Sequence, residues 1–311
     1  MFRAGDLVLV SVSGGADSIC LLYSLWHLRR LMRVRLAVFH FDHRLRTGSA
    51  KDAEYVRGVS GRLGVPFHLV EALTKPRPGQ SVEAWGHRER FASRLAVARD
   101  IEARRIATGH TLDDQAESVL MAAITGSGRT DRLAGIPPVS GQLVRPLLNV
   151  SREETQRFCR SLGLRPRRDP TNEEDRFLRN VLRRRVIPSL EREVGRQVRT
   201  SLARTGAVVR RDAEELARQA EPYIARWLKG VGAADEARLP AADLRGLPPA
   251  IGVRVVQAAF SVSEAPFTDN DVTAVLDLAR GRPGRRVDLS QGLKARRDRE
   301  YVRISLASPG S

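Results

Sequence analysis

Two hydrophobic patterns alternate along the first half of the chain. Short apolar runs with polar boundaries predict strands at residues 7–12, 34–42, 67–70 and 105–108. Between these runs, apolar residues recur at helical spacing over residues 19–31, 51–63 and the stretch after Ser81. Strands that alternate with helices in this order are typical of a mostly parallel sheet with helices on both faces. We therefore expect an α/β fold.

Helical patterns dominate the second half. A capping box begins at Ser151, a long helical stretch covers residues 193–229, and two further helices are expected at residues 241–260 and 269–280. Short antiparallel strands are expected after residue 286. The sequence thus predicts an α/β domain over residues 1–190, a helical bridge over 191–229, and a smaller, mainly helical C-terminal domain over 230–311 that serves as a binding or positioning module.

The first predicted strand runs into six small or polar residues: Ser13, Gly14, Gly15, Ala16, Asp17 and Ser18. Two glycines let backbone N–H groups approach an anion, and the following helix adds its partial positive charge. A carboxylate at Asp17 can hold Mg²⁺ against phosphate oxygens. An ordinary helix cap needs only one polar side chain, so we interpret the stretch as a phosphate-binding loop.

A second polar stretch follows the fourth predicted strand. His110, Asp113 and Glu117 are separated by three and four residues, which places them on one face of the first turns of a helix. Asp42 ends another strand, so it is expected at the same edge of the sheet. Acidic residues stabilise a helix N-terminus, but that role does not account for Glu117. Acids facing a cleft suit a cationic amine or a metal ion.

The net charge is +17, from 53 Lys and Arg against 36 Asp and Glu. So large a basic excess favours a polyanionic partner. Four arginines on one predicted helix are the best candidates for contact with RNA: Arg176, Arg179, Arg183 and Arg184. Arg129 lies in a glycine-containing basic loop that is suited to closing over phosphates.

Several classes of protein are disfavoured by the sequence. No apolar run approaches 18 residues and the first residues lack a signal peptide's apolar region, so we expect a cytoplasmic protein without a membrane segment. Cys20 and Cys159 are far apart in apolar, helical contexts, which predicts buried thiols and no metal or redox pair. His40 and His43 lack a nearby third ligand, so zinc is not expected there.

The loop SGGADS resembles the SGGxDS loop of the N-type ATP pyrophosphatases, or PP-loop proteins, whose fold is adenine nucleotide α-hydrolase-like. Further motifs follow in order: HFDHRLR, EAWGHRERF, TGHTLDDQAES, GSGRTDRLAG, RPLL, DPTN and RNVLR. Together they resemble the tRNA(Ile)-lysidine synthetases over about residues 7 to 190. The likeness is to a short form, without the further C-terminal domain of longer members. Gly86 and His87 depart from the uniform helix expected in EAWGHRERF.

This resemblance implies an activity. ATP would adenylate the C2 oxygen of the wobble cytidine in tRNA(Ile) with a CAU anticodon, and free L-lysine would then attack, giving lysidine and releasing AMP and pyrophosphate. It implies that residues 13–18 bind ATP with Mg²⁺ on Asp17. Arg129 becomes a candidate for the nucleotide phosphates or the adenylate, and the candidates for positioning lysine or the metal are Asp42, His110, Asp113 and Glu117. The oligomeric state stays open, a homodimer included.

Three other functions are less consistent with the sequence. A tRNA thiolation enzyme on the same loop would be expected to carry a cysteine motif, which Cys20 and Cys159 do not form. An amide-forming pyrophosphatase acting on a small molecule would not need the basic helix. An ATP-dependent RNA-binding module without turnover would not need His110, Asp113 and Glu117 together.

Overall fold

The computed structural model describes residues 1–45, 48–77, 79–125, 130–167, 178–195, 197–231, 236–262 and 266–306. These residues form two compact units. The first comprises residues 1–124 and 135–206, and the second comprises 125–134 and 207–311. Helix α9 (Val198–Trp227) contributes residues to both units.

The first unit is built on a six-stranded sheet in the order β3-β2-β1-β4-β6-β5. Its strands are β1 (Leu7–Ser11), β2 (Arg35–Asp42), β3 (Phe67–Glu71), β4 (Arg105–Thr108), β5 (Val139–Ser140) and β6 (Leu143–Val144). All neighbouring pairs are parallel except β5 with β6. The prediction of a mostly parallel α/β sheet is therefore confirmed, and the two-residue β5 is a strand that the sequence did not indicate.

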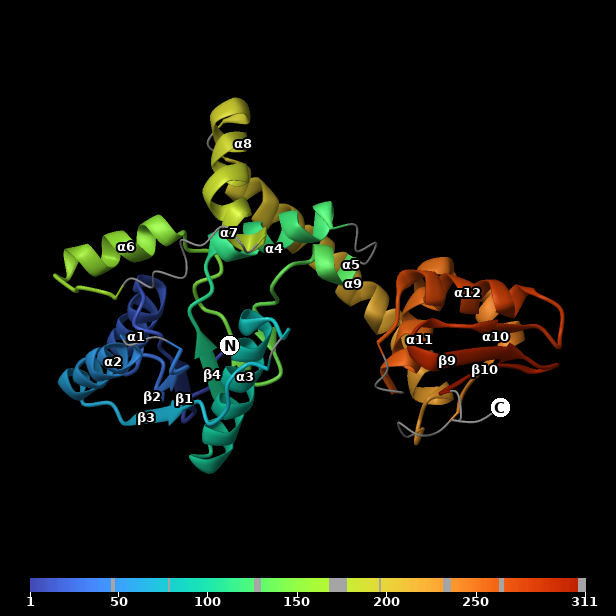
Figure 1. Ribbon diagram of the computed structural model, residues 1–311, viewed down its shortest axis with the longest axis horizontal. Helices are drawn as coiled ribbons and strands as arrows, with labels where there is room; N and C mark the ends of the chain where they lie inside the picture. The colour runs from blue at the N-terminus through green and yellow to red at the C-terminus, as the bar shows by residue number, and fades with distance from the viewer. Residues whose placement is uncertain are drawn as a thin grey trace. The chain divides into compact units, whose positions relative to one another are not determined.

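Helices cover both faces of this sheet (Figure 1). The first unit contains α1 (Ala16–Leu28), α2 (Ser49–Leu63), α3 (Val82–Asp100), α4 (Leu112–Ile124), α6 (Arg152–Ser161), α7 (Leu178–Val181), the π-helix η2 (Leu182–Val186) and α8 (Ile187–Val194). Side chains alternate across β1, so Val8 and Val10 join one core with residues of α1, α2 and α6. Leu9 joins the opposite core with Phe39 of β2 and Trp85 of α3.

The helix expected from residue 193 onward is interrupted. Helix α8 ends at Val194, and Gly195 follows with a φ of 108°, in the region that favours glycine. Helix α9 then begins at Val198. The apolar periodicity continues across this break, which is why the sequence suggested one helix.

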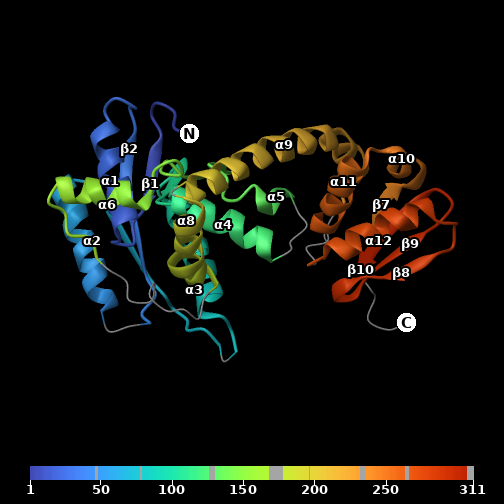
Figure 2. The ribbon, with the colours of Figure 1, turned by 90° about the horizontal axis from the view of Figure 1, so that it is seen from above.

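The second unit has its own core. An antiparallel sheet has the order β7-β10-β9-β8, formed by β7 (Ala237–Pro240), β8 (Arg286–Asp288), β9 (Leu293–Arg297) and β10 (Tyr301–Leu306) (Figure 2). With it are α5 (Thr130–Leu133), α10 (Ala241–Gly246), α11 (Pro249–Val262), α12 (Asp269–Arg280) and the short 3-10 helix η3 (Ser290–Gly292). Strand β7 adds to the strands and helices that the sequence predicted. Across the described parts of the chain, none of the helices combines the length and apolar character needed to cross a bilayer.

Candidate active site

The loop of residues 13–18 turns the chain from β1 into α1. Gly14 has a φ of 95°, and Gly15 is the N-cap of α1. Ser18 closes the turn, because its Oγ donates to the carbonyl of Gly15 at 2.9 Å and accepts from the backbone N–H of Ser13 at 3.2 Å. No side chain caps the first turn of α1. Its N–H groups can therefore donate to an anion.

The strand end at Gly109 packs directly against this loop. A Cβ atom on Gly109 would lie 3.1 Å from the carbonyl carbon and oxygen of Asp17 and from the amide nitrogen of Ser18. Backbone atoms cannot move aside as a flexible side chain can, so only glycine fits here without displacing the loop. Gly109 thereby holds the start of α4 beside the start of α1.

Two carboxylates of α4 form the centre of the site. Asp114 and Glu117 lie one helical turn apart, and the side chain of Glu117 is only 2% exposed. Each accepts hydrogen bonds from the same three guanidinium groups, those of Arg152, Arg179 and Arg183. Burial raises the pKa of each carboxyl, but Arg152 and Arg179 beside Asp114, and Arg183 and Arg179 beside Glu117, bring both pKa values below their usual range. Both acids are therefore ionised at neutral pH.

Arg152 links these acids to the phosphate-binding loop. Its Nη2 lies 3.0 Å from Oδ1 of Asp114, its Nη1 lies 3.4 Å from Oε1 of Glu117, and its Nε lies 3.4 Å from Oδ2 of Asp17. Thr155, one turn further along α6, also donates a hydrogen bond to Asp17. The sequence analysis identified neither residue. One signal was available, because a cation in the first turn of a helix opposes the helix dipole.

The two remaining arginines of the central group were predicted to contact RNA. In the structure, Arg179 donates from Nε to Glu117 at 2.9 Å, and Arg183 donates to both oxygens of Glu117 at 2.7 and 2.9 Å. Their side chains are 31% and 24% exposed. Arg184 is exposed on the same segment, while Arg176 lies outside the described residues. Contact of these arginines with RNA stays a prediction.

Asp113 lies beside the central pair but has different partners. Its Oδ2 accepts from the backbone N–H of Arg152 at 2.7 Å, and its Oδ1 lies 3.0 Å from Nε of Arg199. Glu117 therefore shares its guanidinium partners with Asp114, whereas Asp113 is bound by the backbone N–H of Arg152. The spacing in the sequence suggested Asp113, because one residue of helical rotation cannot be resolved without the structure.

His110 lies outside the helix, contrary to the prediction that it belongs to the first turns. Helix α4 begins at Leu112, and Thr111 precedes it, with its backbone N–H donating to Asp114 at 2.8 Å. His110 Nδ1 lies 3.0 Å from Oγ1 of Thr108. Burial lowers the pKa of His110 to about 4, so its imidazole is neutral at pH 7.

The end of β2 supplies a further carboxylate. Asp42 is buried, and its Oδ1 accepts from the backbone N–H of Arg44 at 2.8 Å. His40 reaches the residue that follows β1, where its Nδ1 lies 2.7 Å from the carbonyl of Val12. His43 packs against Gly86, because a Cβ there would lie 3.1 Å from its ring. Gly86, the departure from a uniform helix, thus makes room for His43.

Metal binding at Asp17 can be assessed from its surroundings. Within the described ranges, no three His, Cys, Asp or Glu side chains are grouped so that they could hold a metal ion. Mg²⁺ commonly takes one or two protein carboxylates and completes its shell with water and substrate phosphate oxygens. Asp17, in the phosphate-binding loop, is such a single carboxylate. The donor set therefore fits an ion that arrives with a nucleotide.

Two other features complete the description. Arg129 lies outside the described residues, but the chain just after it is anchored at Ile136, whose N–H donates to Oε1 of Gln115 at 2.7 Å.

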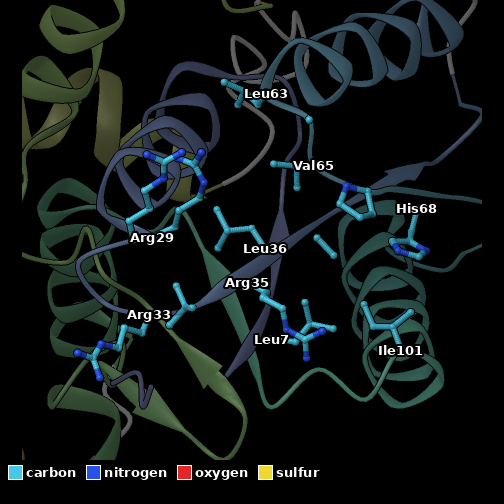
Figure 3. Close-up of a pocket in the computed structure, with 14 residues that line it drawn as sticks. Leu7, Arg29, Arg33, Arg35, Leu36, Leu63, Val65, His68 and Ile101 are labelled. Carbon is cyan, nitrogen blue, oxygen red and sulfur yellow. The ribbon is translucent and has the colours of Figure 1, made fainter. Parts of the chain in front are cut away.

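A cavity of about 640 Å³ lies near the starts of β1 and β2, lined by Arg29, Arg33 and other residues (Figure 3). This is the sheet edge opposite to the phosphate-binding loop, so the cavity is separate from the candidate site.

The comparisons with known proteins agree with this geometry. The PP-loop domain family matches residues 3–190. A tRNA(Ile)-lysidine synthase of Solibacter usitatus is 35% identical over 98% of this chain and 69% of the relative. The chain belongs to the tRNA(Ile)-lysidine synthase family. Two other members of this family, from Symbiobacterium thermophilum and Cutibacterium acnes, are 37% and 36% identical over 94% of this chain.

Members of the tRNA(Ile)-lysidine synthase family differ in length. The chain spans 64% of the Symbiobacterium thermophilum relative but 91% of the Cutibacterium acnes relative. Among solved structures, the U34-tRNA thiolase NcsA from Methanococcus maripaludis, with its [4Fe-4S] cluster, matches with a TM-score of 0.58. It is 16% identical and the match covers 67% of this chain and 73% of that protein, so this likeness concerns the fold alone.

Proposed function

We propose that this protein uses ATP to join L-lysine to C2 of the wobble cytidine in tRNA(Ile) with a CAU anticodon. Membership of the lysidine synthase family supports this activity. The observation that carries it in the structure is the bridge from Asp17 through Arg152 to Glu117. It joins a loop suited to pyrophosphate and a carboxylate pair suited to an amine within one site.

In the first step, the C2 oxygen of cytidine attacks the α-phosphorus of ATP. A bond forms between that oxygen and phosphorus, and the bond to the bridging oxygen breaks to release pyrophosphate. The N–H groups at the start of α1 would donate to the departing phosphates, with the hydroxyls of Ser13 and Ser18 beside them. Mg²⁺ held by Asp17 would neutralise phosphate charge.

In the second step, an amine of lysine attacks C2. The neutral amine forms the new C–N bond, the C2–O bond breaks to release AMP, and the attacking nitrogen passes a proton to solvent. Asp114 and Glu117 are ionised and buried, so they can hold a cationic ammonium group of lysine close to the reacting carbon. Asp42, His110 and Asp113 remain proposed contributors to the same site, and Arg129 a proposed contact for the nucleotide phosphates.

A thiolation reaction is less well supported by the two cysteines. Both are buried, and the Sγ of Cys159 points to the carbonyl of Ala16 at 3.5 Å. Burial raises the pKa of Cys159 to about 11 and also raises that of Cys20. Each thiol is thus protonated at neutral pH, whereas sulfur carriers and cluster ligands act as thiolates.

The proposed function is tested with purified protein, labelled L-lysine, ATP and Mg²⁺. We expect label to enter tRNA(Ile) with a CAU anticodon and not the methionine tRNA that shares this anticodon. Asp17→Asn should abolish incorporation. Release of pyrophosphate with no lysine transfer would show that another nucleophile is used, and no pyrophosphate release with either tRNA would contradict the proposal.

A further inference from the structure

The carboxylates proposed to hold lysine already have cationic partners in the free protein. Both oxygens of Glu117 accept hydrogen bonds from Arg183, and Oε2 also accepts from Arg179 at 2.9 Å. Asp114 lies 3.2 Å from Arg179 and 3.3 Å from Arg183 through its Oδ1. A guanidinium and an ammonium group both bind to carboxylates as cations. The two arginines therefore occupy sites that a lysine ammonium would need.

The carboxylates of the site already have cationic partners without any ligand. Four carboxylates, Asp17, Asp113, Asp114 and Glu117, are paired with four guanidinium groups, Arg152, Arg179, Arg183 and Arg199, the last of which also pairs with Glu191. Adding a lysine cation would place a fourth positive charge beside Asp114 and Glu117, which already share three guanidinium groups. Like charges at short range in a partly buried site repel strongly. Lysine binding is therefore favoured when one of the arginines leaves.

The four arginines are not equally free to move. Arg152 is fixed because its backbone N–H donates to Asp113 and its side chain also pairs with Asp17. Arg199 pairs with both Asp113 and Glu191. Arg179 and Arg183 instead belong to the four-residue α7 and the five-residue π-helix η2. Short π-helical segments are rare and occur often at functional sites.

These two arginines also have an alternative partner in the proposed substrate. An arginine fork binds a phosphate group with the same two-point geometry that it uses for a carboxylate. An RNA backbone brought to the site would thus compete with Glu117 and Asp114 for Arg179 and Arg183. The sequence-based prediction of RNA contact and the observed ion pairs would then describe two states of the same side chains.

We propose that Arg179 and Arg183 neutralise Glu117 and Asp114 in the free protein and exchange to RNA phosphates when tRNA binds, which frees the carboxylates for lysine. This inference rests on the proposed function. It assigns the two arginines the role of specificity-determining residues that admit the amine only when the RNA is in place. By linkage, tRNA must strengthen lysine binding by the same factor as lysine strengthens tRNA binding.

The test measures L-lysine binding to the full chain by equilibrium dialysis, without ATP, in the presence and absence of tRNA(Ile). We expect tRNA to tighten lysine binding by at least about fivefold, and saturating lysine to tighten tRNA binding equally in a filter assay. Arg183→Gln should tighten lysine binding in the absence of tRNA and reduce the effect of tRNA. Arg179→Gln should also tighten lysine binding without tRNA and reduce the effect of tRNA. The inference can therefore still be tested if one of the two variants does not fold.

Arg192→Gln is the matched control, because Arg192 is exposed on α8, close in sequence to η2. It removes the same charge and should leave lysine binding unchanged. Equal lysine binding with and without tRNA would overturn the inference, as would weaker lysine binding by both variants. If the inference is overturned but the wild-type protein still forms lysidine, only the exchange of Arg179 and Arg183 from carboxylates to RNA phosphates is wrong. If the wild-type protein forms no lysidine, the proposed function itself is contradicted.

Discussion

Arg183 donates one hydrogen bond to each carboxylate oxygen of Glu117, from Nε to Oε1 at 2.7 Å and from Nη2 to Oε2 at 2.9 Å. The two residues lie 66 positions apart in the chain. The pair joins helix α4 to the π-helix η2 near the end of the family-matched region, and the carboxylate in it is almost fully buried. A buried carboxylate with such a partner contributes to stability as well as to the proposed chemistry.

Removal of the charge of Glu117 should therefore destabilise the fold. Glu117→Gln leaves three guanidinium groups close together with one compensating charge fewer. We expect the free energy of unfolding to fall by about 2 to 4 kcal/mol in urea denaturation. Glu153→Gln is the control, because its pair with Arg157 is exposed and should contribute less than about 0.5 kcal/mol. Equal losses in both variants would contradict this account.

Gly109 should be intolerant of even a methyl group. Gly109→Ala brings a Cβ to 3.1 Å from the backbone of Asp17 and Ser18, so the phosphate-binding loop has to shift. We expect ATP binding to weaken by about tenfold or more, which isothermal titration calorimetry measures. Gly61→Ala meets nothing within 4 Å in helix α2 and should leave ATP affinity unchanged. Unchanged affinity in Gly109→Ala would show that the close packing is not required.

Arg152 should affect both halves of the proposed reaction. Arg152→Gln removes the group that contacts Asp17 on one side and the α4 acids on the other. We expect pyrophosphate release and lysine transfer to fall together, by about 100-fold or more. Arg157→Gln, on the same helix but exposed, should leave both rates near wild type. Loss of only one of the two steps would contradict the bridging role of Arg152.

His110 should make the folded state sensitive to mild acid. Its pKa is about 4 in the folded protein, because of burial, and about 6.5 when unfolded. Between these pH values the unfolded chain binds a proton that the folded protein does not. The free energy of unfolding therefore falls as pH drops from 6.5 towards 4, by up to about 3 kcal/mol for this group. Above pH 7 His110 is neutral in both states, so its titration does not change the free energy of unfolding.

The measurement compares wild type with His110→Gln in urea denaturation at several pH values from 7 to 4.5. Titration of the other groups is common to both proteins, so their difference isolates the histidine. We expect the variant to gain stability relative to wild type as pH falls. Parallel pH profiles would show that His110 is not held neutral by its surroundings.

Four strands of the parallel sheet could be predicted well, because a parallel strand that is buried on both faces has a continuous run of apolar residues. Strands β1, β2, β3 and β4 were all indicated by such runs, within one or two residues. Strand β5 has only two residues, and the four-residue β7 contains Arg238 and Pro240, so neither forms a continuous apolar run. The turn residues that shape the phosphate-binding loop were recognised because glycine and serine at a strand end carry a local signal.

The partners of the site could not be predicted in the same way. Arg152 contacts Asp17 across 135 positions, and no local pattern records such a pairing. Its place next to the capping residue Ser151 made it look like an ordinary surface residue of a helix start. Arg183 was recognised as basic but assigned to an open face, because the sequence does not show which acids the topology brings opposite it.

The central claim is that the loop of residues 13–18 activates the RNA with ATP, while Glu117 acts on lysine. Exchange of labelled pyrophosphate into ATP in the presence of tRNA(Ile), without lysine, reports the first step alone. Glu117→Gln, assayed at a temperature where it is folded, should retain this exchange within about tenfold of wild type and lose lysine transfer. If exchange and transfer are lost to the same extent, the two roles are not separate and the account is wrong.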